Sequence, residues 1–250
     1  MPEVPLYDAF AEGYDLMTDW ESRLASEAPF LQTLFRNHRV RSVLDAACGT
    51  GQHAMAFARW GLRVTATDLS EPMIARARQN AGDLPVRFLV AGFGEHRQKA
   101  PGPYDAVTCL GNSLPHLLED SALDDALADF RAVLRPGGVL IIQNNNYDAI
   151  LDQQRRFMGV SSRQGQSAEY LFFRFFDMGA PILTFHVVAF TRTAAGWSFA
   201  ESSTRQRALR RDEVTRHLLA AGFPQIAVYG DCQGNEFDAS RSPNLVVVAH

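Results

Sequence analysis

Cysteine is scarce in this chain, with three residues in 250, and their odd number and wide spacing argue against a disulfide framework or a metal site. No apolar run approaches the roughly 18 residues that a membrane-spanning helix requires. Residues 1–5 lack the basic start and the apolar core of a signal peptide, so we expect a cytoplasmic protein. Positive charge is also limited: the net charge is −4 and the isoelectric point is near 6.0. We therefore expect a small-molecule partner rather than nucleic acid or a membrane.

The length and the order of the patterns predict one α/β domain with an insertion. A chain of 250 residues with 46% hydrophobic residues can bury a substantial core. Short apolar runs alternate with amphipathic helical patterns in the first half, which is typical of a doubly wound, mostly parallel sheet. The predicted strands cover residues 43–46, 63–67, 85–90, 104–110 and 139–142, and an antiparallel pair at 225–229 and 244–249 completes seven strands. The predicted helices cover residues 6–17, 21–37, 51–60, 121–134 and 211–221, and one more begins at residue 70.

The stretch Val43 to His53 joins the first predicted strand to the helix that follows it. Its Gly49-Thr50-Gly51 turn lets the backbone approach a ligand, and the helix start presents unpaired N–H groups to it. The glycine spacing suits a nicotinamide dinucleotide as well as S-adenosylmethionine. Asp45 separates the two, because a carboxylate at the strand end would repel a pyrophosphate, whereas S-adenosylmethionine carries no phosphate. Asp68, at the end of the second strand, can accept both ribose hydroxyls.

The stretch Val43 to Arg78 strongly resembles the class I S-adenosylmethionine-dependent methyltransferases, whose first motif reads like Leu44-Asp45-Ala46-Ala47-Cys48-Gly49-Thr50-Gly51. The resemblance implies a Rossmann-like methyltransferase fold with S-adenosylmethionine as the cofactor. It implies cofactor contacts from Tyr14, Arg23, Asp45, Ala47, Gly49, Gly51, Asp68, Leu69, Met73, Gly92, Phe93 and Leu110. Arg23 would hold the methionine carboxylate with its guanidinium fork, while Tyr14 and Met73 have an alternative interpretation as core side chains. Where the family carries an acid or amide for the adenine amino group, this chain has Gly92.

Residues 111–117 follow the fourth strand and resemble the glycine N-methyltransferase group, in which Leu-Gly-Asn-Ser and a His three residues later line the methyl-transfer site. The resemblance implies catalytic positions for Asn112 and His116. Asn112 can orient an amine through its carbonyl oxygen without taking a proton. His116 has an alternative interpretation as a capping or core-edge histidine.

An Asn-Tyr-Asp sequence after strand five is shared with the same group, but the arginine that holds the substrate carboxylate there is replaced by Asn145. An amide cannot pair with a carboxylate charge, so we expect glycine to be a poor substrate unless Arg205 or Arg207 supplies the cation. The predicted substrate contacts are Asn112, Asn145, Tyr147, Arg205 and Arg207. The basic cluster at 205–211 has an alternative interpretation as a solvated face.

These segments divide the chain into three parts. Residues 1–40 are expected to form lid helices over the cofactor, and residues 41–145 together with 208–250 form the cofactor-binding domain. Residues 146–207 contain three strand-like runs, at 170–176, 182–191 and 197–206, which predict an antiparallel insertion. Because the insertion follows strand five, we expect it to roof the substrate pocket.

These patterns predict methyl transfer from S-adenosylmethionine to a small polar acceptor, with the nitrogen of an amine or amino acid favoured. An oxygen acceptor would need deprotonation, and His116 would then be the candidate base. A NAD-dependent oxidoreductase is a second class, supported by the glycine spacing and Asp68. A catalytically silent cofactor-binding module is a third, because Gly92 and Asn145 depart from the family pattern. The acceptor, the number of methyl groups transferred and homo-oligomer formation stay open.

Overall fold

The computed structural model describes residues 15–165 and 168–250. Seven strands form its central sheet: β1 (Ser42–Ala46), β2 (Arg63–Asp68), β3 (Val86–Val90), β4 (Tyr104–Cys109), β5 (Leu134–Asn145), β10 (Ile226–Tyr229) and β11 (Asn244–Ala249). Their order is β10-β11-β5-β4-β1-β2-β3. β11 is antiparallel to both of its neighbours, and the other neighbouring pairs are parallel. The predicted seven-stranded, mostly parallel sheet is confirmed.

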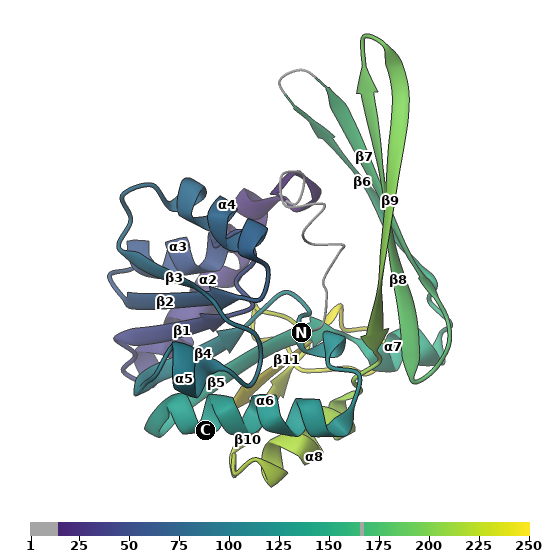
Figure 1. Ribbon diagram of the computed structural model, residues 1–250. Coiled ribbons are helices and arrows are strands. Elements are labelled where there is room, and N and C mark those ends of the chain that lie inside the picture. The colour runs from purple at the N-terminus through teal and green to yellow at the C-terminus, as the bar shows by residue number, and fades with distance from the viewer. Residues whose placement is uncertain (1–14, 166–167) are drawn as a thin grey trace.

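Helices cover both faces of this sheet (Figure 1). They are α2 (Trp20–Asn37), α3 (Gln52–Arg59), α4 (Glu71–Ala81), α5 (His96–Lys99), α6 (Asp120–Val133), α7 (Tyr147–Asp152), α8 (Arg211–Ala220) and the 3₁₀ turn η1 (Leu114–His116). α2, α3 and α4 share one buried cluster with Val139 and Ile141 of β5. α6 and α8 share the other with Leu140 and Ile142. Consecutive strand residues point to opposite faces, which is why the apolar run of β5 is buried on both.

Capping at the start of α4 sets the loop after β2. The Ser70 hydroxyl accepts a hydrogen bond from the Met73 N–H at 3.2 Å, and Pro72 stands in the first turn, where it leaves no intrahelical bond unmade. Only two residues therefore separate the end of β2 from the start of the helix. This short connection holds Asp68 at the carboxyl edge of the sheet, beside the loop that follows β1.

β5 is longer than its apolar run predicts. Residues 135–138 read as a turn in the sequence, yet the strand already pairs with β4 at Leu134 and resumes at Val139. The pairing shifts register between these two points, and Gly137 takes a left-handed conformation with φ of 71°. An Arg-Pro-Gly-Gly sequence thus forms an irregularity within a strand rather than a boundary before one.

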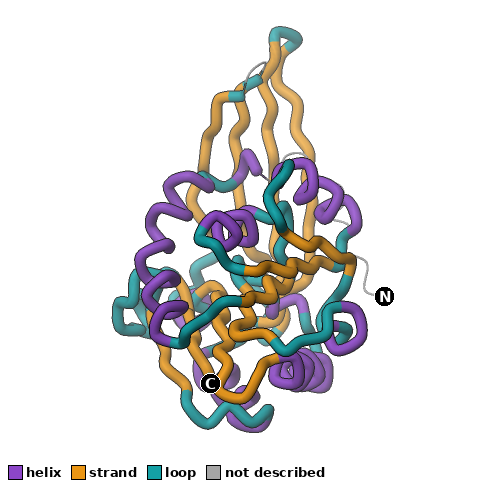
Figure 2. The backbone as a smooth tube through the Cα atoms, turned by 90° about the vertical axis from the view of Figure 1, so that its left-hand side faces the viewer, coloured by secondary structure: helices purple, strands orange, loops and turns teal. Residues whose placement is uncertain are grey.

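A second, four-stranded antiparallel sheet rises from the body of the molecule (Figure 2). It contains β6 (Phe157–Gln164), β7 (Glu169–Asp177), β8 (Ile182–Thr193) and β9 (Gly196–Arg207), paired in chain order. β7, β8 and β9 match the three predicted runs. β6 was not predicted, because its apolar residues are confined to its first half and its side chains are mostly exposed.

The base of this second sheet packs on α7. Tyr147 and Ile150 of α7 form a buried cluster with Phe176, Leu183 and Ala208. Since α7 directly follows β5, this cluster anchors the second sheet at the carboxyl edge of the central one. The first predicted helix, over residues 6–17, falls mainly outside the described residues. Within the described ranges, no helix is both long enough and apolar enough to span a membrane.

Candidate active site

The loop between β1 and α3 has three residues with positive φ: Ala47 at 55°, Gly49 at 55° and Gly51 at 82°. A Cβ added at Gly51 would lie 3.0 Å from both the Ala77 Cβ and a Phe88 ring carbon, so a side chain does not fit there. The Gly49 N–H donates to Asp68 Oδ2 at 2.8 Å. The Ser70 N–H donates to the other oxygen of Asp68 at 2.9 Å. Asp68 therefore joins the two loops that the sequence predicted as the cofactor edge.

Asp45 is a buried carboxyl at the end of β1, with 2% of its surface exposed. Its Oδ1 accepts a hydrogen bond from the Thr108 hydroxyl at 2.7 Å, whereas its Oδ2 is buried and finds no partner in the described part of the chain. Burial raises the pKa of Asp45 from 3.8 to about 6, and nearby Asp68 adds to this, while His53 and Thr108 oppose it. A buried carboxyl with one unsatisfied oxygen suits a cationic ligand.

Asn112 is the centre of a hydrogen-bonded cluster at the ends of β4 and β5. Its Oδ1 accepts from the Asn145 N–H at 2.9 Å, and its Nδ2 donates to the Tyr147 hydroxyl at 3.0 Å and to Gln206 Oε1 at 3.3 Å. The Tyr147 hydroxyl lies 2.9 Å from the same Gln206 oxygen. These bonds and one from its N–H to the Gln143 carbonyl hold Asn112 in a left-handed conformation, with φ of 70°. The structure thus brings together the predicted residues Asn112, Asn145 and Tyr147.

Comparison with known proteins shows the family to which this chain belongs. A methyltransferase domain family matches residues 43–138. A glycine/sarcosine N-methyltransferase of Parasynechococcus marenigrum (strain WH8102) is 33% identical over 229 residues, which cover 90% of this chain and 77% of that protein. The chain belongs to the class I S-adenosylmethionine-dependent methyltransferases.

Further comparisons support the assignment of this chain to the methyltransferases. A glycine/sarcosine N-methyltransferase of Halorhodospira halochloris is 31% identical over 238 residues, with 93% of this chain and 84% of that protein covered. The CcbJ methyltransferase of Streptomyces caelestis superposes with a TM-score of 0.80 at 24% identity, over 100% of this chain and 99% of that one, which shows the same fold. S-adenosylmethionine is therefore the cofactor, and the unsatisfied oxygen of Asp45 fits its positive charge.

Arg23 of α2 lies over the Gly111 turn. One of its terminal nitrogens donates to Gln143 Oε1 at 2.8 Å, and that oxygen also accepts from the Gly111 N–H at 3.0 Å. Its Nε donates to Glu27 at 2.9 Å, and the other Glu27 oxygen lies 2.7 Å from His53 Nε2. α2 thus places the Arg23 guanidinium between the predicted cofactor residues and the predicted acceptor residues. Tyr14, the other predicted contact from this end, lies outside the described residues.

Five predicted cofactor contacts lie in the loops after β2, β3 and β4 or in the first turn of α4. Met73 has 1% and Leu110 6% of its surface exposed. A Cβ at Gly92 would lie 3.2 Å from the Leu69 side chain. Phe93 packs edge-on against Phe130 of α6, which gives the ring a core contact.

Glu95 is an acid near Gly92 that the sequence did not single out. Its Oε2 accepts from the Gly92 N–H at 2.8 Å and from Lys99 at 2.9 Å. The Gly92 bond and the Lys99 bond lower the pKa of Glu95. Glu95, three residues after Gly92, therefore folds back onto the Gly92 backbone.

Asp15 is a second residue near these loops that the sequence patterns did not predict. Its Oδ1 accepts from the Thr50 hydroxyl at 2.5 Å, and its Oδ2 accepts from Asn80 at 2.9 Å. The segment before α2 is thereby tied to the glycine loop and to α4. No local pattern pointed to this residue, because its partners are far away in the sequence.

His116 lies beneath the end of β9. Its Nδ1 is 3.5 Å from the Thr204 hydroxyl, and its Nε2 is 3.5 Å from Gln206 Nε2. Burial lowers the pKa of His116 to about 4, against an opposing hydrogen bond with the Arg205 backbone. His116 is therefore uncharged at pH 7 and a weak base.

The structure does not bring Arg205 and Arg207 to Asn112. Thr204 and Gln206 face His116, so Arg205 between them is on the exposed face of β9. Arg207 is hydrogen-bonded to Asp120 and Glu213. The remaining members of the basic cluster are also paired: Arg210 with Asp148 and Asp152, and Arg211 with Asp212. The sequence shows the basic residues of this cluster, but it does not show which acidic residues the fold places beside them.

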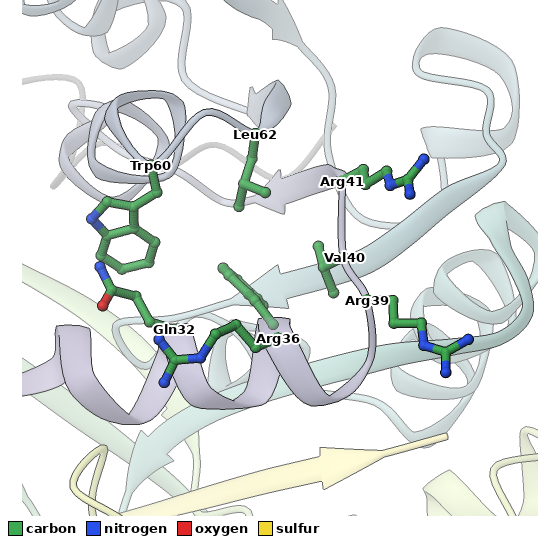
Figure 3. Close-up of a pocket in the computed structure, with 8 residues that line it drawn as sticks. Gln32, Arg36, Arg39, Val40, Arg41, Trp60 and Leu62 are labelled. Atoms are coloured by element: carbon green, nitrogen blue, oxygen red, sulfur yellow. The ribbon is translucent and has the colours of Figure 1, made fainter.

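Two other places in the described residues have features of a ligand site. Asp120, Glu213 and His217 stand close enough to hold a metal ion, but the Arg207 guanidinium already bonds both acids. A hollow of about 600 Å³ lies at the far end of β1 from Asp45, lined by Gln32, Phe35, Arg36, Arg39, Val40, Arg41, Trp60 and Leu62. Figure 3 shows its guanidinium groups spread around the rim rather than converging on one point. No residue predicted for the cofactor or the acceptor lines this hollow.

Proposed function

We propose that this methyltransferase transfers a methyl group to the nitrogen of a small polar amine or amino acid bound at Asn112. The observation that carries the proposal is the set of uncharged oxygens on Asn112, Tyr147 and Gln206, which are held together by hydrogen bonds of 2.9–3.3 Å among these three side chains. Such oxygens accept N–H bonds without removing the proton, so they orient an amine and leave its lone pair for attack on the methyl group.

The electrostatics of this cluster favour nitrogen over oxygen. Burial raises the pKa of Tyr147 above its usual range and lowers that of His116 to about 4, so both are neutral at pH 7. A desolvated, uncharged site disfavours an ammonium ion, and the acceptor therefore binds as the free amine. A hydroxyl acceptor would need a stronger base than His116. The names of the two glycine/sarcosine relatives support the same choice.

The cofactor contacts in this proposal follow the charges of the site. Asp68 receives the ribose hydroxyls, since carboxylate oxygens each accept more than one hydrogen bond. Asp45 offers its unsatisfied oxygen to the cationic methionine end, and Arg23 takes the methionine carboxylate. Glu95 accepts from the adenine amino group in place of a side chain at position 92.

The other two parts of the chain enclose this site. Residues 1–40 act as a lid, to which α2 contributes Arg23 and Asp15 contributes its bond to Thr50. Residues 146–207 act as a roof through Gln206. The expected cytoplasmic location and the expected lack of nucleic-acid and membrane partners stay predictions.

Purified protein, S-adenosylmethionine and a panel of amines test this proposal when S-adenosylhomocysteine and the methylated product are both measured. Asn112→Gly removes the side-chain amide and tolerates the positive φ of this position. We expect kcat to fall by about two orders of magnitude or more, which follows from the loss of a positioning group, while cofactor affinity stays unchanged. Asn37→Ala, at the exposed end of α2, is the matched control. Methyl transfer to a hydroxyl acceptor alone would contradict the proposal.

A further inference from the structure

Arg23, which the proposed function assigns to the methionine carboxylate, is held by three other side chains. Its Nε donates to Glu27 Oε1 at 2.9 Å, and its Nη2 donates to Gln143 Oε1 at 2.8 Å. Its guanidinium carbon lies 5.0 Å from the centre of the Trp20 ring. Bonds at Nε and at one terminal nitrogen fix both the position and the plane of a guanidinium group. Its Nη1 has no hydrogen-bond partner in the described residues, so this nitrogen can still donate to a carboxylate.

Glu27 is the buried acid of this group. It is 7% exposed, and it lies one turn after Arg23 on the same side of α2. Its Oε2 lies 2.7 Å from the Nε2 of His53, which is in the first turn of α3. Burial opposes ionisation of Glu27, but its bonds with His53 and Arg23 outweigh burial and lower its pKa. Glu27 is therefore a carboxylate at pH 7, with one oxygen on each partner.

His53 connects this carboxylate to the glycine loop. It stands two residues after Gly51, which caps the start of α3 with φ of 82°. Its side chain is buried and packs edge-on against Trp20, at a ring-centroid distance of 5.5 Å. Because Glu27 bonds both His53 and Arg23, it sets the distance between the guanidinium on α2 and the loop that follows β1.

We propose that Glu27 is a positioning residue for the cofactor, which holds the Arg23 guanidinium where the methionine carboxylate of S-adenosylmethionine binds. This inference rests on the Arg23 contact in the proposed function. A guanidinium that is oriented before binding loses little freedom when it bonds a carboxylate. A buried ion pair is often no more stabilising than apolar packing of the same volume, so orientation explains this acid better than stability does. Without Glu27, Arg23 keeps its bond to Gln143 but loses the second fixed point.

The test compares the binding of S-adenosylmethionine with that of decarboxylated S-adenosylmethionine, which lacks only the carboxylate. In calorimetry the wild type should bind the complete cofactor about tenfold or more tightly, as expected for a charge-assisted hydrogen bond. Glu27→Ala should reduce this ratio to about threefold or less, while affinity for the decarboxylated compound changes less than about twofold. Glu27→Gln keeps an oxygen for Arg23 Nε and should retain the ratio. Glu21→Gln, exposed in the first turn of α2, is the matched control and should leave both affinities unchanged.

The outcomes separate a positioning role from a structural one and from the proposed function. Equal weakening of both compounds in Glu27→Ala, an unchanged ratio, or tighter binding of the complete cofactor would overturn the role of Glu27. If Glu27→Ala does not fold, Glu27→Leu fills the same space without the bonds, and the same ratio decides. A wild-type ratio near one, or a ratio that Arg23→Gln leaves unchanged, would refute the Arg23 contact and with it the role of Glu27. Amine methylation is measured separately through its products, so it can stand when this binding result fails.

Discussion

Replacing Asp45 with Asn is expected to stabilise the cofactor-free protein and to weaken cofactor binding. Burial raises the pKa of Asp45 from 3.8 to about 6, so the folded protein keeps this proton at pH values where the unfolded chain has released it. The contribution of Asp45 to stability therefore falls as pH rises from 3.8 to 6, and its loss is complete above that window. At about 1.4 kcal/mol per pH unit, a shift of about two units costs about 3 kcal/mol.

Asp45→Asn removes this cost and keeps an oxygen for the Thr108 hydroxyl. Chemical denaturation at pH 7, without cofactor, should show a free energy of unfolding up to about 3 kcal/mol higher than that of the wild type. The difference should shrink toward pH 4, where the wild-type carboxyl is protonated in both states. Asp83→Asn, in the exposed loop before β3, is the control that changes the same charge without the burial.

The same variant should bind S-adenosylmethionine more weakly, because the positive charge of the cofactor loses its carboxylate. In the wild type, binding favours the ionised form of Asp45, so affinity is full above pH 6 and falls below it. At pH 5 about one molecule in ten is ionised for a pKa of about 6, and calorimetry should show an affinity about tenfold lower than at pH 7. Asp45→Asn should lack this pH dependence. Wild-type affinity in the variant at pH 7, or equal wild-type affinities at pH 5 and pH 7, would refute the reasoning.

Three further variants test separate parts of the structure. Asp129→Asn should lower the free energy of unfolding at pH 7 by about 3 kcal/mol, since the buried His96 loses a charged partner at 2.8 Å; urea titration beside the exposed Asp125→Asn measures it, and equal midpoints would contradict it. Burial opposes ionisation of Asp129, but bonds from the His96 side chain and from the Arg97 and His96 N–H groups outweigh it and lower its pKa. The contribution of Asp129 to stability is therefore full above about pH 4 and is lost as pH falls below it. The pKa of His116, lowered to about 4, predicts that the contribution of His116 to stability falls by up to about 3 kcal/mol from pH 6.5 to pH 4. His116→Gln should lack that contribution when its pH–stability curve is compared with that of the wild type, and an inflection of kcat/KM near pH 6.5 that disappears in His116→Gln would instead identify a base. Glu95→Ala should raise the Kd for S-adenosylmethionine about tenfold through one lost charge-assisted hydrogen bond, and an unchanged Kd would remove Glu95 from the adenine site.

The central sheet could be predicted from the sequence because its signals are local. Val139 to Ile142 is apolar on both faces, and Ser70 caps α4 within its own first turn. The failures are also local in origin. A strand such as β6, whose second half is polar and whose side chains are mostly exposed, has no apolar alternation along its length to reveal it. The Arg-Pro-Gly-Gly sequence in β5 reads as a turn even though pairing with β4 continues around it.

Some residues of the candidate site could likewise be predicted from local sequence, and others could not. Asp45, Asp68 and Asn112 follow directly from strand ends, and the structure places them at one edge of the sheet. Gln206 is 94 residues from Asn112 and meets it because the end of β9 returns to the ends of β4 and β5, which no local pattern records. Arg207 was predicted as a possible partner for the acceptor's carboxylate, but in the fold it is paired with Asp120 and Glu213. Charge assignments in this chain depend on which acids the tertiary structure brings near.

The most direct test of the central claim is mass spectrometry of reaction products from S-adenosylmethionine and a panel of primary and secondary amines, amino acids and alcohols. We predict S-adenosylhomocysteine and an N-methylated product in equal amounts for at least one amine or amino acid, and loss of both in Asn112→Gly. S-adenosylmethionine binding without methyl transfer to any nitrogen, or a product methylated on oxygen alone, would contradict the account.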